Sequence, residues 1–122
     1  MLHVLIVDDD RDTAEMLATA CTVFGYSPVK AHSGKDALEI ISSNKPDIVL
    51  LDLMMPEMDG YETLRRLRSM PEGNDLPVIV ITAMQADNLE ASVDTAGGDA
   101  CIRKPIDLQA LARTLSEYCS DG

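Results

Sequence analysis

The chain has 122 residues, of which 46% are apolar and 25% charged, and its 21 acidic and 10 basic side chains give a formal charge of −11. This length predicts one globular domain, because a chain of this size buries roughly two-thirds of the surface that it exposes when unfolded. The negative charge argues against direct binding to nucleic acid or to an anionic membrane surface. It favours cations and basic surfaces of other proteins as partners.

The N-terminus and the cysteines both predict a cytoplasmic protein. The apolar run over residues 2–7 is far shorter than the roughly 20 residues of a membrane span. It leads directly into three Asp residues, without the cleavage site of a signal peptide. Cys21, Cys101 and Cys119 are odd in number and far apart, which suits neither a disulfide framework nor a zinc site with paired ligands. We therefore expect reduced, mostly buried thiols.

Strand-like runs alternate with helical patterns along the whole chain. Short apolar runs predict strands over residues 2–7, 28–31, 48–51, 78–82 and 100–102. Apolar residues at helical spacing predict helices over residues 14–21, 35–42, 61–68, 87–96 and 108–115. Gly25, Ser33, Gly97 and Asp107 stand where a helix is expected to begin or end. This alternation continues from one end of the chain to the other.

Such alternation predicts an α/β fold, a single doubly wound (βα)5 domain with helices on both faces of a parallel five-stranded sheet. Ligands bind such sheets beyond the carboxyl ends of the strands. The second strand ends in His32 and Ser33, whereas the other four strands end in residues that can carry chemistry. We therefore expect the second strand at an edge, in the order 2-1-3-4-5, with a crevice between the first and third strands.

Polar side chains at four strand ends would meet at this crevice. They are Asp8, Asp9 and Asp10 after the first strand, Asp52 after the third, Thr82 at the fourth, and Arg103, Lys104 and Pro105 after the fifth. Carboxylates within about 4 Å repel one another by roughly 4 kcal/mol per pair at an effective dielectric near 20, so they need a cation. Mg²⁺ fits a few oxygen ligands better than Ca²⁺ does. Carboxylates, a metal, a hydroxyl and an ammonium group together indicate phosphoryl transfer to an Asp.

Four sequence blocks carry a family resemblance: LIVDDD over 5–10, VLLDLMMPEMDG over 49–60, VIVITA over 78–83 and RKP over 103–105. In this order they resemble the motif blocks of the response-regulator receiver domain of two-component signalling. The resemblance covers the whole chain and is to the chemotaxis-regulator-like members, with a flavodoxin-like fold. It implies a receiver domain over residues 1–119 and a tail over 120–122.

The resemblance implies a metal site. Asp52 would be the phosphoacceptor and also a ligand of Mg²⁺. Asp9 would bind the ion directly, Asp8 mainly through water, and the backbone carbonyl of Met54 would supply a further ligand. Asp10 is expected to begin the following helix instead of binding the metal.

The resemblance also implies how the phosphoryl group is held and read. Thr82 and Lys104 would each bond a phosphoryl oxygen, and Pro105 would follow a cis peptide bond. The donor would be a phospho-His on a sensor histidine kinase or a His-phosphotransfer protein, so the chain would act as a switch and not as a metabolic enzyme. An output partner or fused output domain would read the helix over 87–96, the strand over 100–102 and the last helix. Because only a short tail follows that helix, we expect a domain that acts alone or one cut from a larger protein.

Three positions depart from the usual family pattern. Cys101 stands three residues before Lys104, where the family usually has an aromatic residue that turns inward on activation. A thiol cannot act as such a reporter, and we expect Cys101 to be a small buried hydrophobe. Met54 and Met84 stand two residues after the acceptor and after the Thr, at positions that influence the attacking water. Neither side chain orients water well, so we expect slow self-dephosphorylation.

Two other functions fit parts of the pattern. The segment over 8–12 has the DxD spacing of haloacid-dehalogenase-type phosphatases, in which Asp8 would be the nucleophile. Against this, Asp12 stands where that motif has Thr or Val, and the chain leaves no room for the usual larger core. A receiver-like module that only binds partners typically lacks the acidic pair, the acceptor or the Lys, all of which this chain retains. His3 and His32 are assigned structural roles.

Overall fold

The computed structural model describes residues 2–83 and 87–118, and within these ranges strands and helices alternate as expected. All neighbouring strands pair in parallel, in the order β2-β1-β3-β4-β5. The elements are β1 (His3–Val7), α1 (Arg11–Val23), β2 (Ser27–Ala31), α2 (Gly34–Ser43), β3 (Ile48–Asp52), α3 (Gly60–Arg68), β4 (Val78–Thr82), α4 (Leu89–Ala96), β5 (Ala100–Arg103) and α5 (Leu108–Tyr118). The predicted fold class and strand order are confirmed.

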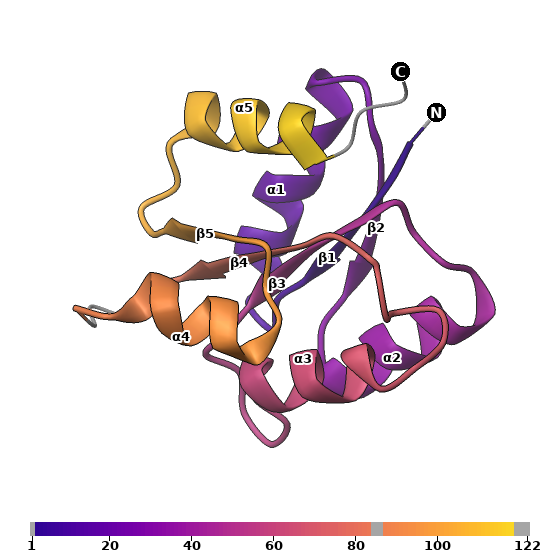
Figure 1. Cartoon of the computed structure of the whole chain (residues 1–122). Helices are drawn as coiled ribbons and strands as arrows, with labels where there is room; N and C mark the ends of the chain where they lie inside the picture. The colour runs from indigo at the N-terminus through magenta and orange to yellow at the C-terminus, as the bar shows by residue number, and fades with distance from the viewer. Residues whose placement is uncertain (1, 84–86, 119–122) are drawn as a thin grey trace.

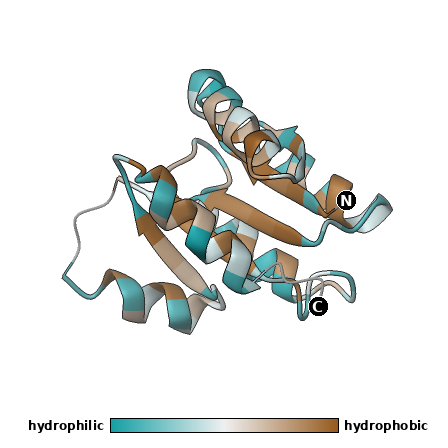
Figure 2. Ribbon diagram, turned by 90° about the horizontal axis from the view of Figure 1, so that it is seen from above, coloured by the Kyte–Doolittle hydropathy of each residue, from teal (hydrophilic) through white to brown (hydrophobic). Residues whose placement is uncertain are grey.

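The sheet separates two apolar layers (Figure 1). Helices α1 and α5 cover one face, where Val4 and Ile6 of β1 pack with Leu17 and Leu111. Helices α2, α3 and α4 cover the other face. Because side chains alternate along a strand, the next residues of β1 reach that second layer. The strands form an apolar middle layer in Figure 2, and β3 and β4 are buried at all five positions.

Backbone pairing shifts several predicted boundaries by one or two residues. Ser27 joins β2 because it pairs with His3, and Asp52 joins β3 because it pairs with Ile81. Leu2 lies outside β1 although it is apolar. The helix expected over 87–96 begins only at Leu89. Hydropathy locates the apolar part of an element, whereas hydrogen bonding to neighbours decides where it ends.

The residues that the sequence predicts at the ends of helices lie at helix ends in the structure. The Ser33 hydroxyl caps α2 by accepting a hydrogen bond from the Asp36 backbone N–H at 3.1 Å. Asp107 accepts from the Gln109 N–H at 2.9 Å at the start of α5. Gly25 and Gly97, which follow α1 and α4, have φ angles of 95° and 106°. This left-handed conformation is easiest for glycine and is common just after a helix.

Two further expectations concern the cysteines and membranes. Cys21 is a buried cysteine, and Cys101 is only partly buried. Burial raises the pKa of Cys101, and the nearby Glu90 carboxylate raises it further. Cys119 and the tail over 120–122 lie outside the described residues. Among the helices of the described ranges, none combines the length and apolarity needed to cross a bilayer.

Candidate functional site

The carboxyl edge of the sheet brings the predicted acidic residues and Lys104 together. One carboxylate oxygen from each of Asp8, Asp9 and Asp52 lies within 4.8 Å of the others. The Lys104 ammonium lies 3.5 Å from Asp8 Oδ2 and 3.8 Å from Asp52 Oδ2. These groups come from the ends of β1, β3 and β5, which are not all neighbours in the sheet. The site is therefore assembled by strand order, as the sequence predicts.

Asp8 is held by the turn between β1 and α1. Its backbone N–H donates to Ala31 O of the neighbouring strand at 3.0 Å, and its Oδ1 accepts from the Asp10 N–H at 2.9 Å. The side chain is 2% exposed, whereas Asp9 beside it is exposed. Asp10 is the N-cap of α1 and accepts from the Thr13 hydroxyl at 2.7 Å. The adjacent acidic residues thus have three different surroundings.

Asp52 ends β3 in the middle of this edge and is 5% exposed. Its Oδ1 accepts a hydrogen bond from the Met54 backbone N–H at 3.1 Å. Burial raises the pKa of Asp52 to about 6, and the neighbouring Asp8 carboxylate acts in the same direction. The Met54 N–H and the Lys104 ammonium oppose this rise. The site thus holds a carboxylate whose charge is poorly compensated by the protein alone.

The loop after Asp52 folds tightly against β3. The Gly60 N–H donates to Leu53 O at 2.9 Å. A Cβ atom at Gly60 would lie 2.4 Å from Leu53 Cα and 2.6 Å from Asp52 O, so a larger residue cannot fit without moving the backbone. Asp59 caps α3 by accepting from the Glu62 N–H at 2.9 Å. Packing at Gly60 therefore sets the course of the chain that carries Met54.

Thr82 and Lys104 lie on the other side of the site. Thr82 is the fully buried last residue of β4, and its backbone carbonyl accepts from the Lys104 N–H at 2.8 Å. The Lys104–Pro105 peptide bond is cis, as the resemblance implies. The Met54 side chain is 56% exposed, and Met84 lies outside the described residues.

The donor set suits a hard divalent cation. The three carboxylates offer only oxygen atoms, which Mg²⁺ and Ca²⁺ prefer, whereas zinc sites commonly use Cys or His. At an effective dielectric near 20, a carboxylate pair 4 Å apart repels by roughly 4 kcal/mol, which a bound dication offsets. One ammonium group shared between Asp8 and Asp52 compensates only part of this charge. The residues present therefore fit Mg²⁺.

Two residues support the site through contacts that the sequence does not reveal. The His32 Nδ1 atom lies 3.1 Å from Asp8 O, so this histidine supports the first loop of the site from the end of β2. Gly60 excludes any side chain from the turn behind Asp52. The Asp-Gly pair at 59–60 signals a helix start, but not the close approach to β3. His3, by contrast, lies at the start of β1, and its backbone N–H donates to Asp47 Oδ2 at 2.7 Å.

Comparisons with known proteins identify the family of the chain. The profile of the response regulator receiver domain matches residues 4–116. Response regulator MprA of Mycobacterium avium is 42% identical over 110 residues, which are 90% of this chain and 47% of that protein. The same identity and coverage are found for Response regulator MprA of Mycobacterium ulcerans. The chain thus spans about half the length of these relatives.

Solved structures show the same fold. The signal receiver domain of a signal transduction histidine kinase from Syntrophus aciditrophicus is 31% identical, with a TM-score of 0.89 over 98% of this chain and 91% of that one. Chemotaxis protein CheY4 of Vibrio cholerae has a TM-score of 0.90 over 97% of this chain and 98% of that one, at 24% identity, and supports the fold alone. With the profile match over most of its length, the chain belongs to the receiver domain family of two-component response regulators.

Proposed function

We propose that Asp52 accepts a phosphoryl group from a phospho-His on a sensor histidine kinase or His-phosphotransfer protein, and that this transfer switches the domain. The observation that carries the proposal is the position of the Lys104 ammonium, 3.5 Å from Asp8 and 3.8 Å from Asp52. A cation between two buried carboxylates stands where an anionic group attached to Asp52 would need positive charge. The family of the chain supports the same function.

Mg²⁺ is the proposed cofactor. Asp9, Asp52 and the Met54 backbone carbonyl would hold it directly, and Asp8 would hold it mainly through water. Bound there, the ion would supply positive charge to the oxygens of a transferring phosphoryl group. Deprotonation of Asp52 is a condition for binding, because a protonated carboxyl is a poor ligand.

The chain's own residues would then carry the transfer. One Asp52 carboxylate oxygen forms a bond to phosphorus while the bond from phosphorus to the donor histidine nitrogen breaks, leaving that nitrogen with the electron pair. Lys104 binds a phosphoryl oxygen on which negative charge gathers, and it leaves its present position between the carboxylates to do so. The Thr82 hydroxyl donates to another phosphoryl oxygen. Catalysis rests on position and charge, as is general for phosphoryl transfer.

The output surface is proposed to comprise α4, β5 and α5. Arg103 of β5 lies 3.3 Å from the Glu90 carboxylate of α4. A movement of the first turn of α4 would therefore change this contact with β5. A shift between two conformations of this surface would select the output partner or a fused output domain. Cys101 replaces the usual aromatic reporter, so Thr82 and the start of α4 would carry the signal.

Mass spectrometry after incubation with acetyl phosphate and Mg²⁺ tests the acceptor. We expect the wild type and the matched control Asp94→Asn, at an exposed position of α4, to gain one phosphoryl group. Asp52→Asn should gain none, and Asp8→Asn should gain less because it binds the ion weakly. Label that survives Asp52→Asn and disappears in Asp8→Asn would show the phosphatase chemistry instead. If no variant is labelled and no Mg²⁺-dependent binding of beryllofluoride occurs, the chain is a binding module.

We also propose that the phosphorylated domain loses its phosphoryl group slowly, over minutes to hours. The exposed Met54 side chain offers the attacking water no good hydrogen bond. Met54→Asn supplies an amide that can orient water, and we expect hydrolysis to speed up by roughly tenfold. The decay of the labelled protein, followed by mass spectrometry, measures the rate, with Met16→Asn on α1 as control. A wild-type lifetime of seconds would contradict the proposal.

A further inference from the structure

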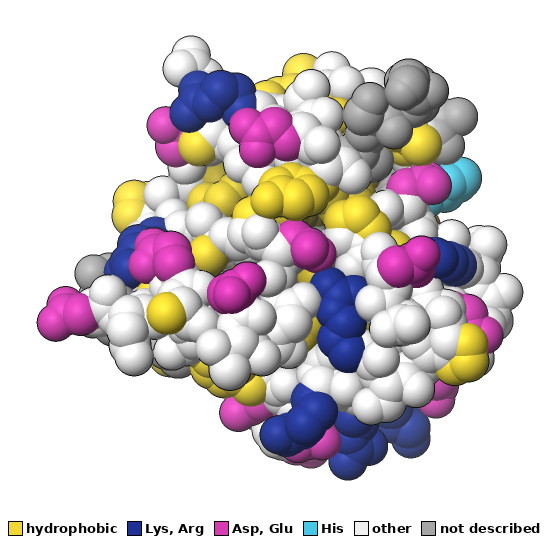
Figure 3. Space-filling model, viewed as in Figure 1, with side chains coloured by type: hydrophobic (Ala, Val, Ile, Leu, Met, Phe, Trp, Pro, Cys, Tyr) yellow, Lys and Arg dark blue, Asp and Glu magenta, His cyan; other side chains and the backbone are white. Residues whose placement is uncertain are grey.

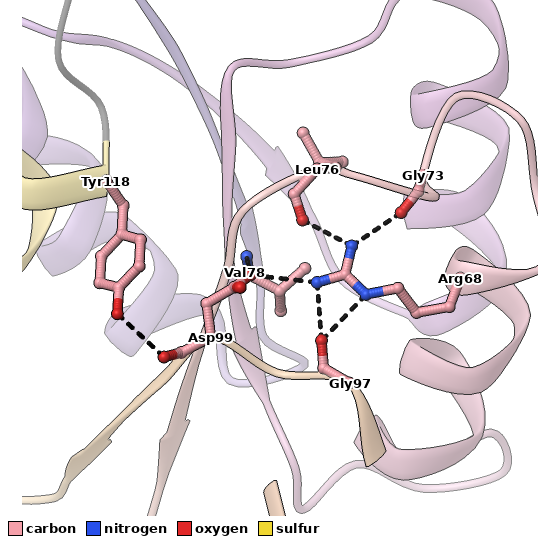
Figure 4. Close-up of polar contacts among 7 residues, drawn as sticks. All are labelled: Arg68, Gly73, Leu76, Val78, Gly97, Asp99 and Tyr118. Atoms are coloured by element: carbon pink, nitrogen blue, oxygen red, sulfur yellow. Dashed lines mark hydrogen bonds and ion pairs between the residues drawn. The ribbon is translucent and has the colours of Figure 1, made fainter. Parts of the chain in front are cut away.

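The guanidinium group of Arg68, at the end of α3, is fully occupied by hydrogen bonds (Figure 4). Nε and Nη2 donate to Gly97 O at 2.9 and 2.7 Å, and Nη2 also donates to Asp99 Oδ2 at 3.1 Å. Nη1 donates to Gly73 O at 2.7 Å and to Leu76 O at 2.6 Å. A guanidinium has five N–H donors in a fixed plane. Every one of them therefore has an acceptor.

Asp99 extends this set of contacts to β4 and α5. Its Oδ2 accepts from the Val78 N–H at 2.9 Å as well as from Arg68, and its own N–H donates to Val78 O at 2.9 Å. Its backbone carbonyl accepts from the Tyr118 hydroxyl at 3.0 Å. The Arg68 network consists of Arg68, Gly73, Leu76, Val78, Gly97, Asp99 and Tyr118 (Figure 4). It joins the ends of three helices to the amino edge of the sheet, opposite the acidic site.

The two ends of α4 are attached very differently. At the C-terminal end, the Gly98 N–H donates to Val93 O at 2.9 Å, and the Gly97 carbonyl takes two of the charged hydrogen bonds from Arg68. The Arg68 stem packs so closely that a Cβ at Gly97 would lie 3.1 Å from its Cγ. At the N-terminal end, the Asn88 side chain makes no capping hydrogen bond. The first turn of α4 also has a charged contact, between Glu90 and Arg103 at 3.3 Å, but both of these side chains are exposed. The Arg68 guanidinium is largely buried and donates five hydrogen bonds, so the C-terminal end is held more firmly.

We propose that the Arg68 network makes the C-terminal end of α4 a fixed pivot, so that α4 moves by swinging its first turn about Gly97. The first turn follows Thr82 in the chain and lies toward the carboxyl edge, where the site is. The part of the surface around Glu90 and Arg103 would therefore change, whereas the part around Asp99 and Tyr118 would stay constant. This goes beyond the proposed function, because it concerns how a helix is attached and not what happens at Asp52.

Amide hydrogen exchange of the full chain, measured residue by residue without ligand, tests the pivot. In the wild type, the Ser92 amide in the first half of α4 should exchange faster than those of Gly98 and Asp99. In Arg68→Ala, Gly98 and Asp99 should exchange roughly tenfold faster or more relative to core amides such as that of Leu50. In this variant, the ratio of the Ser92 exchange rate to the exchange rate of the core amides should stay as in the wild type.

Two further variants separate this role from a general loss of stability. Arg66→Ala removes an exposed guanidinium of the same helix that pairs with Glu62, and it should leave the pattern as in the wild type. Arg68→Lys keeps the charge but not the planar set of donors, so it should speed Gly98 and Asp99 less than Ala does. If Arg68→Ala does not fold, the exchange rates of the wild type and of Arg68→Lys test the pivot. Equal exchange at Ser92 and Gly98 in the wild type, or an equal increase at both in the variants, would overturn the pivot.

Discussion

At the scale of single residues, the same side chain behaves differently in each place that the fold puts it. Burial raises the pKa of Asp52 to about 6. The Thr13 hydroxyl holds the pKa of the exposed Asp10 below its usual value. The Asp10 side chain caps the start of α1. The raised pKa of Asp52, in contrast, favours the binding of a proton or a cation at its carboxylate. Of these two carboxylates, the fold thus stabilises the ionised form of Asp52, the proposed phosphoacceptor, less than that of Asp10.

This difference predicts a pH effect on stability. Between about pH 4 and about pH 6, folded Asp52 keeps a proton that the unfolded chain has released, so this residue's contribution to stability falls as the pH rises. Asp52→Asn lacks this loss, and at pH 7 without metal we expect it to be more stable than the wild type by up to about 3 kcal/mol. Urea unfolding across this pH range, in the presence of a chelator, measures the difference. An advantage of Asp52→Asn that is the same at pH 4 and pH 7 would disprove this account, and Asp94→Asn should show no such change.

At the scale of elements, the tight loop between β3 and α3 begins directly after Asp52 of the candidate site. Gly60 begins α3 directly against Leu53 and Asp52, and its backbone N–H closes the turn. Gly25, in contrast, lies in open space after α1 with a φ of 95°. At Gly60, a side chain would collide with the backbone of β3. At Gly25, a side chain would meet no atom, but the left-handed backbone favours glycine. The two positions therefore make a matched pair for mutation.

Gly60→Ala should affect both stability and the site. Its Cβ would force β3 and α3 apart, and we expect a loss of about 2–3 kcal/mol together with weaker Mg²⁺ binding, because the Met54 backbone would move. Gly25→Ala should cost about 1–2 kcal/mol for its left-handed backbone and leave Mg²⁺ binding unchanged. Urea unfolding and titration with Mg²⁺ measure the two effects. Wild-type Mg²⁺ affinity in a folded Gly60→Ala protein would show that the turn does not position the site.

At the scale of the whole molecule, the formal charge is −11. On the face seen in Figure 3, acidic side chains are scattered among basic and uncharged ones. Exposed ion pairs such as Lys45 with Asp75 and Arg66 with Glu62 offset part of the repulsion, but each contributes at most about 1 kcal/mol. A net repulsion between acidic groups therefore opposes folding at low ionic strength.

Salt should therefore stabilise this protein. Between about 0.02 and 0.5 M NaCl, we expect the free energy of unfolding to rise by about 1 kcal/mol as the repulsion is screened. Urea unfolding at each salt concentration measures it. A double variant that neutralises two exposed acids, Glu39→Gln with Asp94→Asn, should show a smaller rise. A fall in stability with salt would mean that attractive ion pairs dominate the surface.

Much of the fold and of the candidate site could be predicted without coordinates. The apolar runs and helical periods show five strands alternating with five helices, because burial of one face imposes its period on the sequence. The strand order followed from which strands end in reactive side chains. Since parallel strands end at a common edge, Asp8, Asp52 and Lys104 were expected to meet, and the structure brings them together.

Other properties were decided by contacts between distant parts of the chain. Three arginines near the end of α3 look alike in the sequence. Arg65 and Arg66 form exposed ion pairs with Glu62. Arg68 instead donates to the backbone carbonyl of Gly97, 29 residues away. The contact of His32 with Asp8 and the burial behind the raised pKa of Asp52 also depend on neighbouring strands. Local sequence determines which elements form and which face is apolar. Only tertiary packing decides which polar atoms are shielded from water and which partners they meet there.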